Sequence, residues 1–255
     1  MEDFDMKKKL NYILLFLVFS LWQPLFSATA DSLYNQRDYS GAAAEWDSLS
    51  RLYPCAENYY NLGNCHFRMG DLGRAVLNYE RALRYAPLDD DIVYNLELCK
   101  SRTFQGSADD SSEMFFVTGF RNFCSALTPA EWGIGAYVSL AFFLLFLLLR
   151  KIWGDVPSFI RIAWIGKVML FVFFLSLSLA LWQQHVYDTD KRAIVLGEVP
   201  LLDKPQAGAS EISRLYPGNY VYVSELSSGG YTQIVCPGER TGWVKTDFIE
   251  MINQP

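Results

Sequence analysis

Hydrophobic positions follow three different patterns along the chain, and each pattern predicts a different kind of element. Long apolar runs with few polar residues occupy 10–21, 132–149 and 162–182. Over 31–102, apolar residues recur at helical spacing, which predicts amphipathic helices. After residue 190, short β-rich runs alternate with turn residues, which predicts a small domain of strands. The chain is therefore expected to combine helices and a small β domain with membrane-length segments.

The first apolar run has the features of an export signal. Three lysines at 7–9 precede it, and the small residues of Ala28–Ala30 follow it. A positive start, an apolar centre and a small-x-small site are typical of a secretory signal peptide. We therefore expect a signal peptide over 1–30, cleaved after its last residue, with translation starting at Met1 or Met6. The alternative is a first membrane anchor that stays in place.

Residues 56–89 carry the pattern of a helical repeat. They match the tetratricopeptide pattern, whose period is about 34 residues. The matching positions are Tyr59, Leu62, Gly63, Ala75, Tyr79, Ala82 and Pro87. Gly63 and Ala75 allow two antiparallel helices to approach closely, and Pro87 ends the second helix. The resemblance implies a pair of packed antiparallel helices.

Partial copies of this unit lie on both sides of it. Trp46 precedes Tyr79 by about one period, and Cys99 follows Cys65 by one period. Because a repeat cannot bury its apolar face alone, we expect 31–102 to hold a truncated repeat, a full repeat and a capping helix. Packed helices lie about 8–10 Å apart, whereas a disulfide needs Cα atoms within about 7 Å. The two cysteines are therefore expected to be separate buried thiols.

One face of these helices is the candidate partner-binding surface. In the tetratricopeptide family, a concave groove is lined by the first helix of each repeat. The residues expected there are Tyr60, Asn61, Asn64, Phe67 and Asn95. A groove that mixes amides and aromatic rings suits an extended peptide, because amides pair with a peptide backbone. The alternative is an ordinary solvated helix face.

Two apolar runs predict a transmembrane hairpin with helices over 131–150 and 162–182. Each run is long enough to cross the hydrocarbon layer of a bilayer. The second carries one charge, Lys167, near its start, where a lysine side chain can reach the interface. The preceding segment, 103–130, is expected to be a linker that contains either an interfacial helix or a helix docked on the repeat domain.

The loop between the two spans, 151–161, predicts their orientation. Arg150, Lys151 and Arg161 make this region basic, and the positive-inside bias places such loops in the cytoplasm. The export signal independently places 31–130 outside. Both arguments put the two folded domains on the external side of the cytoplasmic membrane.

The segment 190–252 predicts a small β-barrel. Its five β-rich runs are Arg192–Leu196, Val199–Leu202, Tyr220–Glu225, Tyr231–Cys236 and Gly242–Lys245. The stretch Gly238–Val244 (GERTGWV) resembles the end of bacterial SH3 (SH3b) domains, and Pro217-Gly218 fits a turn of that family. The resemblance implies that Tyr231 and Trp243 line a ligand groove; the alternative is that Trp243 is structural.

Composition argues against several classes of function. The chain carries a net charge of −6, so it lacks the basic excess that a nucleic-acid partner requires. Five cysteines without a CxxC pair and only two histidines argue against a metal site. None of the common hydrolase, P-loop or dinucleotide-binding motifs is present. We therefore expect no enzymatic activity, no catalytic residues and no cofactor.

The order of the parts resembles the BatE-type proteins of bacterial aerotolerance operons. The shared order is a signal peptide, tetratricopeptide helical hairpins, a transmembrane hairpin and a C-terminal SH3-like β-barrel. The resemblance implies a scaffold or chaperone-like adaptor in the envelope. It also implies partners: membrane proteins with von Willebrand A domains and a MoxR-type AAA ATPase. The alternative function is binding of peptidoglycan peptides through the SH3b domain.

Overall fold

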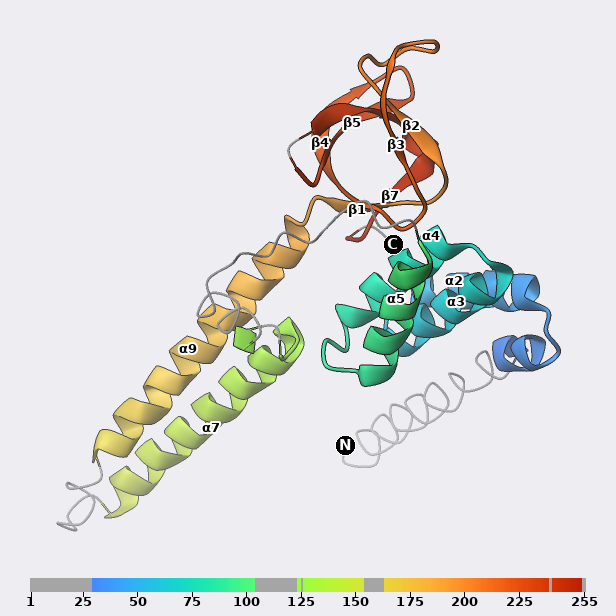
Figure 1. Cartoon of the computed structure of the whole chain (residues 1–255). Helices are drawn as coiled ribbons and strands as arrows, with labels where there is room; N and C mark the ends of the chain where they lie inside the picture. The colour runs from blue at the N-terminus through green and yellow to red at the C-terminus, as the bar shows by residue number, and fades with distance from the viewer. Residues whose placement is uncertain (1–28, 104–122, 125, 154–162, 239, 254–255) are drawn as a thin grey trace, which may run out of the picture. The chain divides into compact units, whose positions relative to one another are not determined.

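The structure, a computed structural model, describes residues 29–103, 123–124, 126–153, 163–238 and 240–253. Contacts divide the chain into two compact units. The first unit combines the repeat helices with the C-terminal strands, and the second contains two long apolar helices and the turn Leu83–Asp89. Each unit is described separately below (Figure 1).

Several expectations fall outside the described residues. The expected signal peptide at 1–30 has only its last two positions described, and Ala30 lies buried in a helix over 29–35. Most of the expected interfacial helix lies in the gap 104–122, and most of the basic loop lies in the gap 154–162. These three expectations remain predictions.

The first unit begins with five packed helices. They are the helix over 29–35, α2 (Tyr39–Leu52), α3 (Ala56–Met69), α4 (Leu72–Leu83) and α5 (Asp90–Arg102). α3 and α4 are the helical pair of the expected full repeat; the helix over 29–35 and α2 precede this pair, and α5 follows it.

Equivalent positions of successive repeats are buried alike. Trp46 and Tyr79 are both buried, as are Cys65 and Cys99. Both cysteines are free thiols, as expected. Burial raises the pKa of each thiol to about 11, so both remain protonated and chemically inert near neutral pH.

Asp71 caps the start of α4. Its Oδ1 accepts a hydrogen bond from the backbone N–H of Arg74 at 3.2 Å, and its Oδ2 accepts one from the Arg74 guanidinium at 2.8 Å. The ring of His66 lies beside it, with Nδ1 3.6 Å from Oδ2. Burial alone would raise the pKa of Asp71, but the nearby His66 ring and the hydrogen bonds from Arg74 lower it to about 2.

We predict that Asp71→Ala lowers the free energy of unfolding by about 1 kcal/mol at neutral pH, the usual effect of removing an N-cap. The folded-state pKa lies below the unfolded value of 3.8. The contribution of the carboxylate is therefore complete above pH 4 and disappears as the pH falls toward about 2. Denaturant titrations of both proteins in detergent between pH 7 and pH 2.5 measure this difference.

The control for this prediction is Asp47→Ala, which removes an exposed pair with Arg51. We expect this change to alter stability little, because exposed pairs contribute little. A difference between wild type and Asp71→Ala that stays constant down to pH 2.5 would contradict the capping role.

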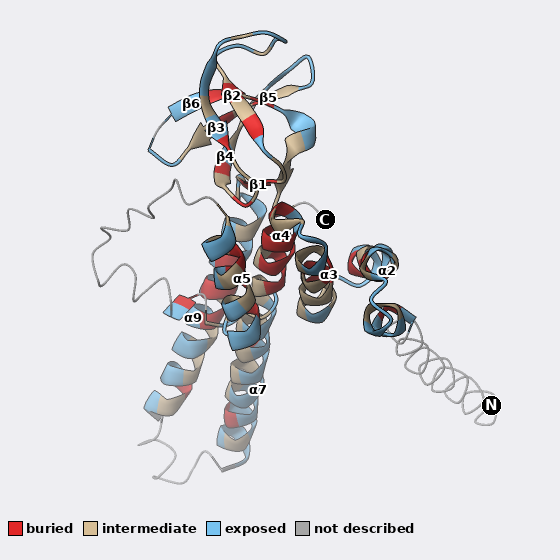
Figure 2. Cartoon of the chain, turned by 45° about the vertical axis from the view of Figure 1, so that its right-hand side comes forward, coloured by how far each residue is buried: buried red, intermediate tan, exposed pale blue. Residues whose placement is uncertain are grey.

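The C-terminal part of the first unit is an antiparallel sheet with seven strands in the described residues. They are β1 (Arg192–Val195), β2 (Val199–Leu202), β3 (Glu211–Leu215), β4 (Tyr220–Ser228), β5 (Tyr231–Cys236), β6 (Arg240–Lys245) and β7 (Ile249–Met251). Their order is β3-β2-β6-β5-β4-β1-β7. One face forms a core with side chains from six of these strands, among them Val195, Leu201, Ile234 and Val244 (Figure 2).

The prediction of a small β domain is confirmed; the domain has seven described strands where the sequence analysis identified five β-rich runs, and its sheet is not closed. β3 and β7 form two open edges, and no strand pairing joins them in the described residues. β7 pairs with β1 on one side only. The buried guanidinium of Arg81 in α4 donates to the carbonyl oxygens of Met251 at 3.0 Å and Ile252 at 3.4 Å. The repeat thus supplies hydrogen bonds at the edge strand.

The sheet and α4 approach each other closely within the first unit. A Cβ atom added to Gly73 would lie 2.4 Å from the carbonyl oxygen of Leu196. A Cβ atom on Gly218, which has a positive φ of 85°, would lie 2.9 Å from Thr103 and 3.4 Å from Val76. Gly73 therefore allows α4 to meet the backbone of the β part directly, and Gly218 packs against the side chains of Thr103 and Val76.

We predict that Gly73→Ala destabilises the protein. In an exposed helix this change would add about 1 kcal/mol of stability. Here the new methyl group meets backbone atoms of Leu196 that cannot rotate away, so the free energy of unfolding should fall by about 1–3 kcal/mol. The control is Gly133→Ala, because no atom lies within 4 Å of the added Cβ. Thermal unfolding of both variants checks this; a Gly73→Ala protein as stable as wild type would contradict the close packing.

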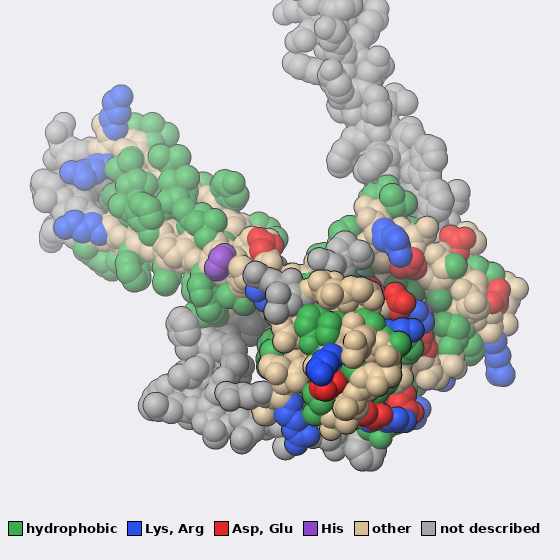
Figure 3. Space-filling view, turned by 90° about the horizontal axis from the view of Figure 1, so that it is seen from above, with side chains coloured by type: hydrophobic (Ala, Val, Ile, Leu, Met, Phe, Trp, Pro, Cys, Tyr) green, Lys and Arg blue, Asp and Glu red, His purple; other side chains and the backbone are tan. Residues whose placement is uncertain are grey.

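The second unit contains two antiparallel helices, α7 (Pro129–Trp153) and α9 (Ala163–Asp188). Both are long and apolar enough to cross a membrane by length and composition. They pack closely, because a Cβ on Gly166 would lie 2.7 Å from the ring of Phe146. Figure 3 shows hydrophobic side chains over this hairpin with Lys and Arg at one end. α7 extends beyond both ends of its predicted span of 131–150, and α9 extends beyond the C-terminal end of its predicted span of 162–182.

Candidate functional site

The candidate groove is held together by hydrogen bonds between α3, α4 and α5. The hydroxyl of Tyr79 in α4 donates to Oδ1 of Asn64 in α3 at 2.7 Å. Nδ2 of Asn95 in α5 donates to the hydroxyl of Tyr60 at 3.0 Å and to Oδ1 of Asn64 at 3.3 Å. Three neighbouring helices are thus joined by one polar network.

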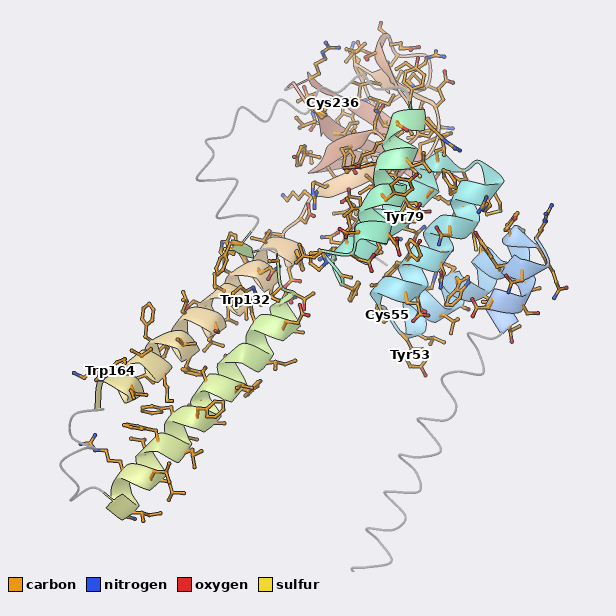
Figure 4. The ribbon with its side chains drawn as sticks, turned by 60° about the horizontal axis from the view of Figure 1, so that its bottom comes forward. Tyr53, Cys55, Tyr79, Trp132, Trp164 and Cys236 are labelled. Carbon is orange, nitrogen blue, oxygen red and sulfur yellow. The ribbon has the colours of Figure 1, made fainter. Side chains whose placement is uncertain are left out.

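Tyr79 lies at the centre of this network and is fully buried in α4 (Figure 4). Its ring packs against Gly63, where an added Cβ would lie 2.8 Å from Cε1, and lies 5.9 Å from the ring of Tyr60. Burial strongly raises the pKa of Tyr79. The hydroxyl therefore stays protonated and remains a donor to Asn64 near neutral pH.

This network fixes the orientation of two amide groups. Oδ1 of Asn64 accepts two hydrogen bonds, so Nδ2 of Asn64 is left to donate outward. Both N–H bonds of the Asn95 amide are used, so Oδ1 of Asn95 is left to accept. Within the described residues, neither Nδ2 of Asn64 nor Oδ1 of Asn95 takes a hydrogen bond. An adjacent donor and acceptor match the two polar groups of a peptide unit.

The expected groove residues do not all behave alike. Tyr60, Asn64 and Asn95 belong to the network, and Phe67 lies at the end of the same helix face. Asn61 is half-buried and takes no part in these hydrogen bonds. The binding role of all five residues remains a prediction.

Sequence reasoning missed two arginines at the C-terminal ends of α3 and α5. The guanidinium of Arg102 lies 4.7 Å over the ring of Phe67, and Nε of Arg68 donates to the hydroxyl of Tyr34 at 3.3 Å. The signal that could have found them is the repeat period itself, because Arg102 follows Arg68 at the equivalent position. They place two cations at one end of the face that carries Phe67.

The second candidate surface lies on the sheet. Ile234 and Val244 face the core, so Tyr231 and Trp243 lie on the opposite face of β5 and β6, where both are half-buried. Gln233 pairs with Trp243 in the register, which makes the two aromatic residues diagonal neighbours. Tyr222 of β4 is exposed and lies on the same face. It pairs with Val235, which points away from the core because the next residue, Ile234, points into it. The sequence analysis did not select Tyr222.

No metal-binding cluster appears in the described residues. No group of three or more His, Cys, Asp or Glu side chains there could hold a metal ion. Both candidate surfaces offer amides, hydroxyls and aromatic rings, which favour recognition of a ligand over its chemical conversion.

Comparison with known families identifies one segment of the chain. Residues 56–89 match the family model of the tetratricopeptide repeat, and these residues contain α3 and α4. No curated protein matches the chain. A tetratricopeptide repeat supports a role as a protein-interaction scaffold.

We predict that Tyr79→Phe lowers the free energy of unfolding by about 1 kcal/mol. The change deletes the hydroxyl that donates to Asn64 and leaves the ring against Gly63, so the loss is that of one hydrogen bond. The matched control is Tyr94→Phe, because Tyr94 is an exposed tyrosine of α5. Denaturant titrations compare the two variants, and equal stabilities would show that the network does not hold the three helices together.

Proposed function

We propose that this protein is a non-enzymatic, membrane-anchored adaptor whose repeat groove binds an extended segment of a partner protein at the bacterial envelope. The observation that carries the proposal is the pair of oriented amides on Asn64 and Asn95. Buried tyrosine and amide hydrogen bonds hold them in place before any ligand arrives, so binding costs little side-chain ordering.

The chemistry of the groove supports a peptide as its ligand. The Asn64 amide offers N–H donors and the Asn95 amide offers a carbonyl acceptor, which together pair with the C=O and N–H of a peptide backbone. The rings of Tyr60 and Phe67 offer apolar surface for ligand side chains. Arg68 and Arg102 favour an acidic group on the ligand at their end of the groove.

The contact between the repeat and the sheet supports an orientation for the anchor. Arg81 precedes the hairpin of α7 and α9 in the sequence, and its ion-pair partner Glu250, 2.8 Å away, follows the hairpin. Two parts that touch must lie on the same side of a membrane, so the hairpin crosses it an even number of times. Together with the expected export signal, this supports two spans in the inner membrane with both folded parts external.

The partners follow from the family resemblance. BatE-type proteins are encoded with von Willebrand A-domain membrane proteins and a MoxR-type AAA ATPase. In this proposal, the groove binds a segment of one of these membrane proteins, and the complex contributes to stress tolerance or aerotolerance.

The alternative function uses the sheet. Tyr222, Tyr231 and Trp243 lie on one face of the sheet, outside its core. Aromatic side chains outside the core favour a ligand with apolar groups. If the SH3b resemblance holds, that ligand is a peptidoglycan peptide.

The test of the groove is Asn64→Asp in the full chain, co-purified with its partners in mild detergent and quantified by mass spectrometry. The new carboxylate still accepts from Tyr79 and Asn95, but it replaces the outward donor with an oxygen that repels a peptide carbonyl. We predict at least a tenfold loss of the partners, since an unpaired polar group is costly at a buried contact. The matched control is Asn35→Asp, which makes the same change at an exposed position outside the candidate groove.

Equal capture by the two variants would show that the groove is not the binding site. Trp243→Ala tests the alternative in a parallel experiment, in which each variant is cosedimented with purified wall material. If only Trp243→Ala loses this cosedimentation, the sheet is favoured as the binding surface. Partners that include neither a von Willebrand A-domain protein nor an AAA ATPase would remove the family-based part of the proposal.

A further inference from the structure

The turn between α4 and α5 belongs to the same compact unit as the two apolar helices. The guanidinium of Arg84 donates to the carbonyl oxygen of Tyr187 at 3.1 Å, and it lies 4.7 Å over the ring of Tyr187. Tyr187 belongs to the last turn of α9, which ends at Asp188. The repeat turn is therefore held against the end of the hairpin where α9 leaves the apolar region.

This turn exposes large apolar side chains. Leu88 is 70% exposed and Tyr85 is 45% exposed. The turn between α2 and α3 offers a close match, because Leu52 is 70% exposed and Tyr53 is 45% exposed. Single exposed apolar residues are common on soluble surfaces. What distinguishes Leu88 is its turn, because Arg84 of this turn contacts the last turn of α9, and α9 is long and apolar enough to cross a membrane.

The same end of the hairpin carries more exposed apolar and aromatic residues. Phe123 is 57% exposed, and its ring lies 5.7 Å from that of Trp132 in the first turn of α7. Trp182 in α9 is also exposed. Figure 4 shows Trp132 and Trp164 near opposite ends of the hairpin. Tryptophan, tyrosine and arginine concentrate where the hydrocarbon layer of a bilayer meets its headgroups.

We infer that the turn 83–89 is a membrane-contacting surface whose partner is the headgroup layer of the bilayer. Leu88 enters the outer edge of the hydrocarbon layer, and Arg84 and Tyr187 lie at headgroup level. Phe123, which precedes α7, and Trp132 in its first turn lie at the same level. The inference rests on the proposed anchoring by α7 and α9, and it assigns to the tetratricopeptide repeat a second, lipid-facing contact.

The test uses the full chain in lipid vesicles with one small fluorophore attached to a cysteine. Cys55 and Cys236, which are only half-buried, are replaced by alanine, and the other three cysteines are buried. Separate proteins carry Leu88→Cys, Leu52→Cys as the matched control, or Leu175→Cys near the middle of α9. The vesicles contain a phosphatidylcholine with a nitroxide quencher either near the headgroup or deep in the acyl chain.

We expect the Leu88→Cys label to be quenched by the shallow nitroxide at least about twofold more than the Leu52→Cys label. The Leu175→Cys label should be quenched most by the deep nitroxide. If Leu175→Cys is quenched but Leu88→Cys is quenched no more than Leu52→Cys, the lipid contact of the turn is wrong and the anchoring is retained. If Leu175→Cys is not quenched, the anchoring itself is wrong and the lipid contact falls with it.

Discussion

The interaction on which the first unit depends is the burial of Arg81 between α4 and the sheet. Its guanidinium donates to two backbone carbonyls and pairs with Glu250. A buried charge without such partners would cost several kcal/mol, so the helix and the strand edge must remain together. Because these groups lie far apart in sequence, this one contact ties the two ends of the chain to each other and to one side of any membrane that the hairpin crosses.

The candidate groove likewise depends on hydrogen bonds made by a buried side chain. Tyr79 is buried for packing reasons, yet its hydroxyl also decides which way the Asn64 amide faces. Packing between the repeat helices therefore orients the groups that a ligand would meet. A substitution in the core of α4 can change the groove without touching its surface.

Local signals made much of the fold predictable from the sequence. The repeat period located α3 and α4, and the length of the apolar runs located α7 and α9. β3 was missed because its residues, with Glu211 and Arg214 exposed at an edge, lack the alternation of a half-buried strand. β7 was missed because it has three residues and is defined by pairing with β1, a contact that leaves no local pattern.

The candidate site was predictable only in part. The repeat position of Tyr60 and Asn64 indicated the groove, but the hydrogen bonds that orient their side chains join three helices. The contact of Arg81 with Met251 and Ile252 could not be predicted from the sequence. It joins one segment that precedes the membrane-length runs in the sequence to another that follows them. Such long-range pairings depend on the assembled fold rather than on any window of residues.

The ion pairs of Glu80 show where a segment of this chain could be replaced by a linker. One of its carboxylate oxygens lies 3.4 Å from Nζ of Lys100, and the other lies 4.0 Å from the guanidinium of Arg192. Lys100 lies near the end of α5, and Arg192 is the first residue of β1. The end of the repeat helices and the start of the sheet therefore both lie close to Glu80. In architectural terms, the two long apolar helices are inserted in the sequence between parts of one compact unit. A short flexible linker in place of this insertion would join two segments that already meet at Glu80.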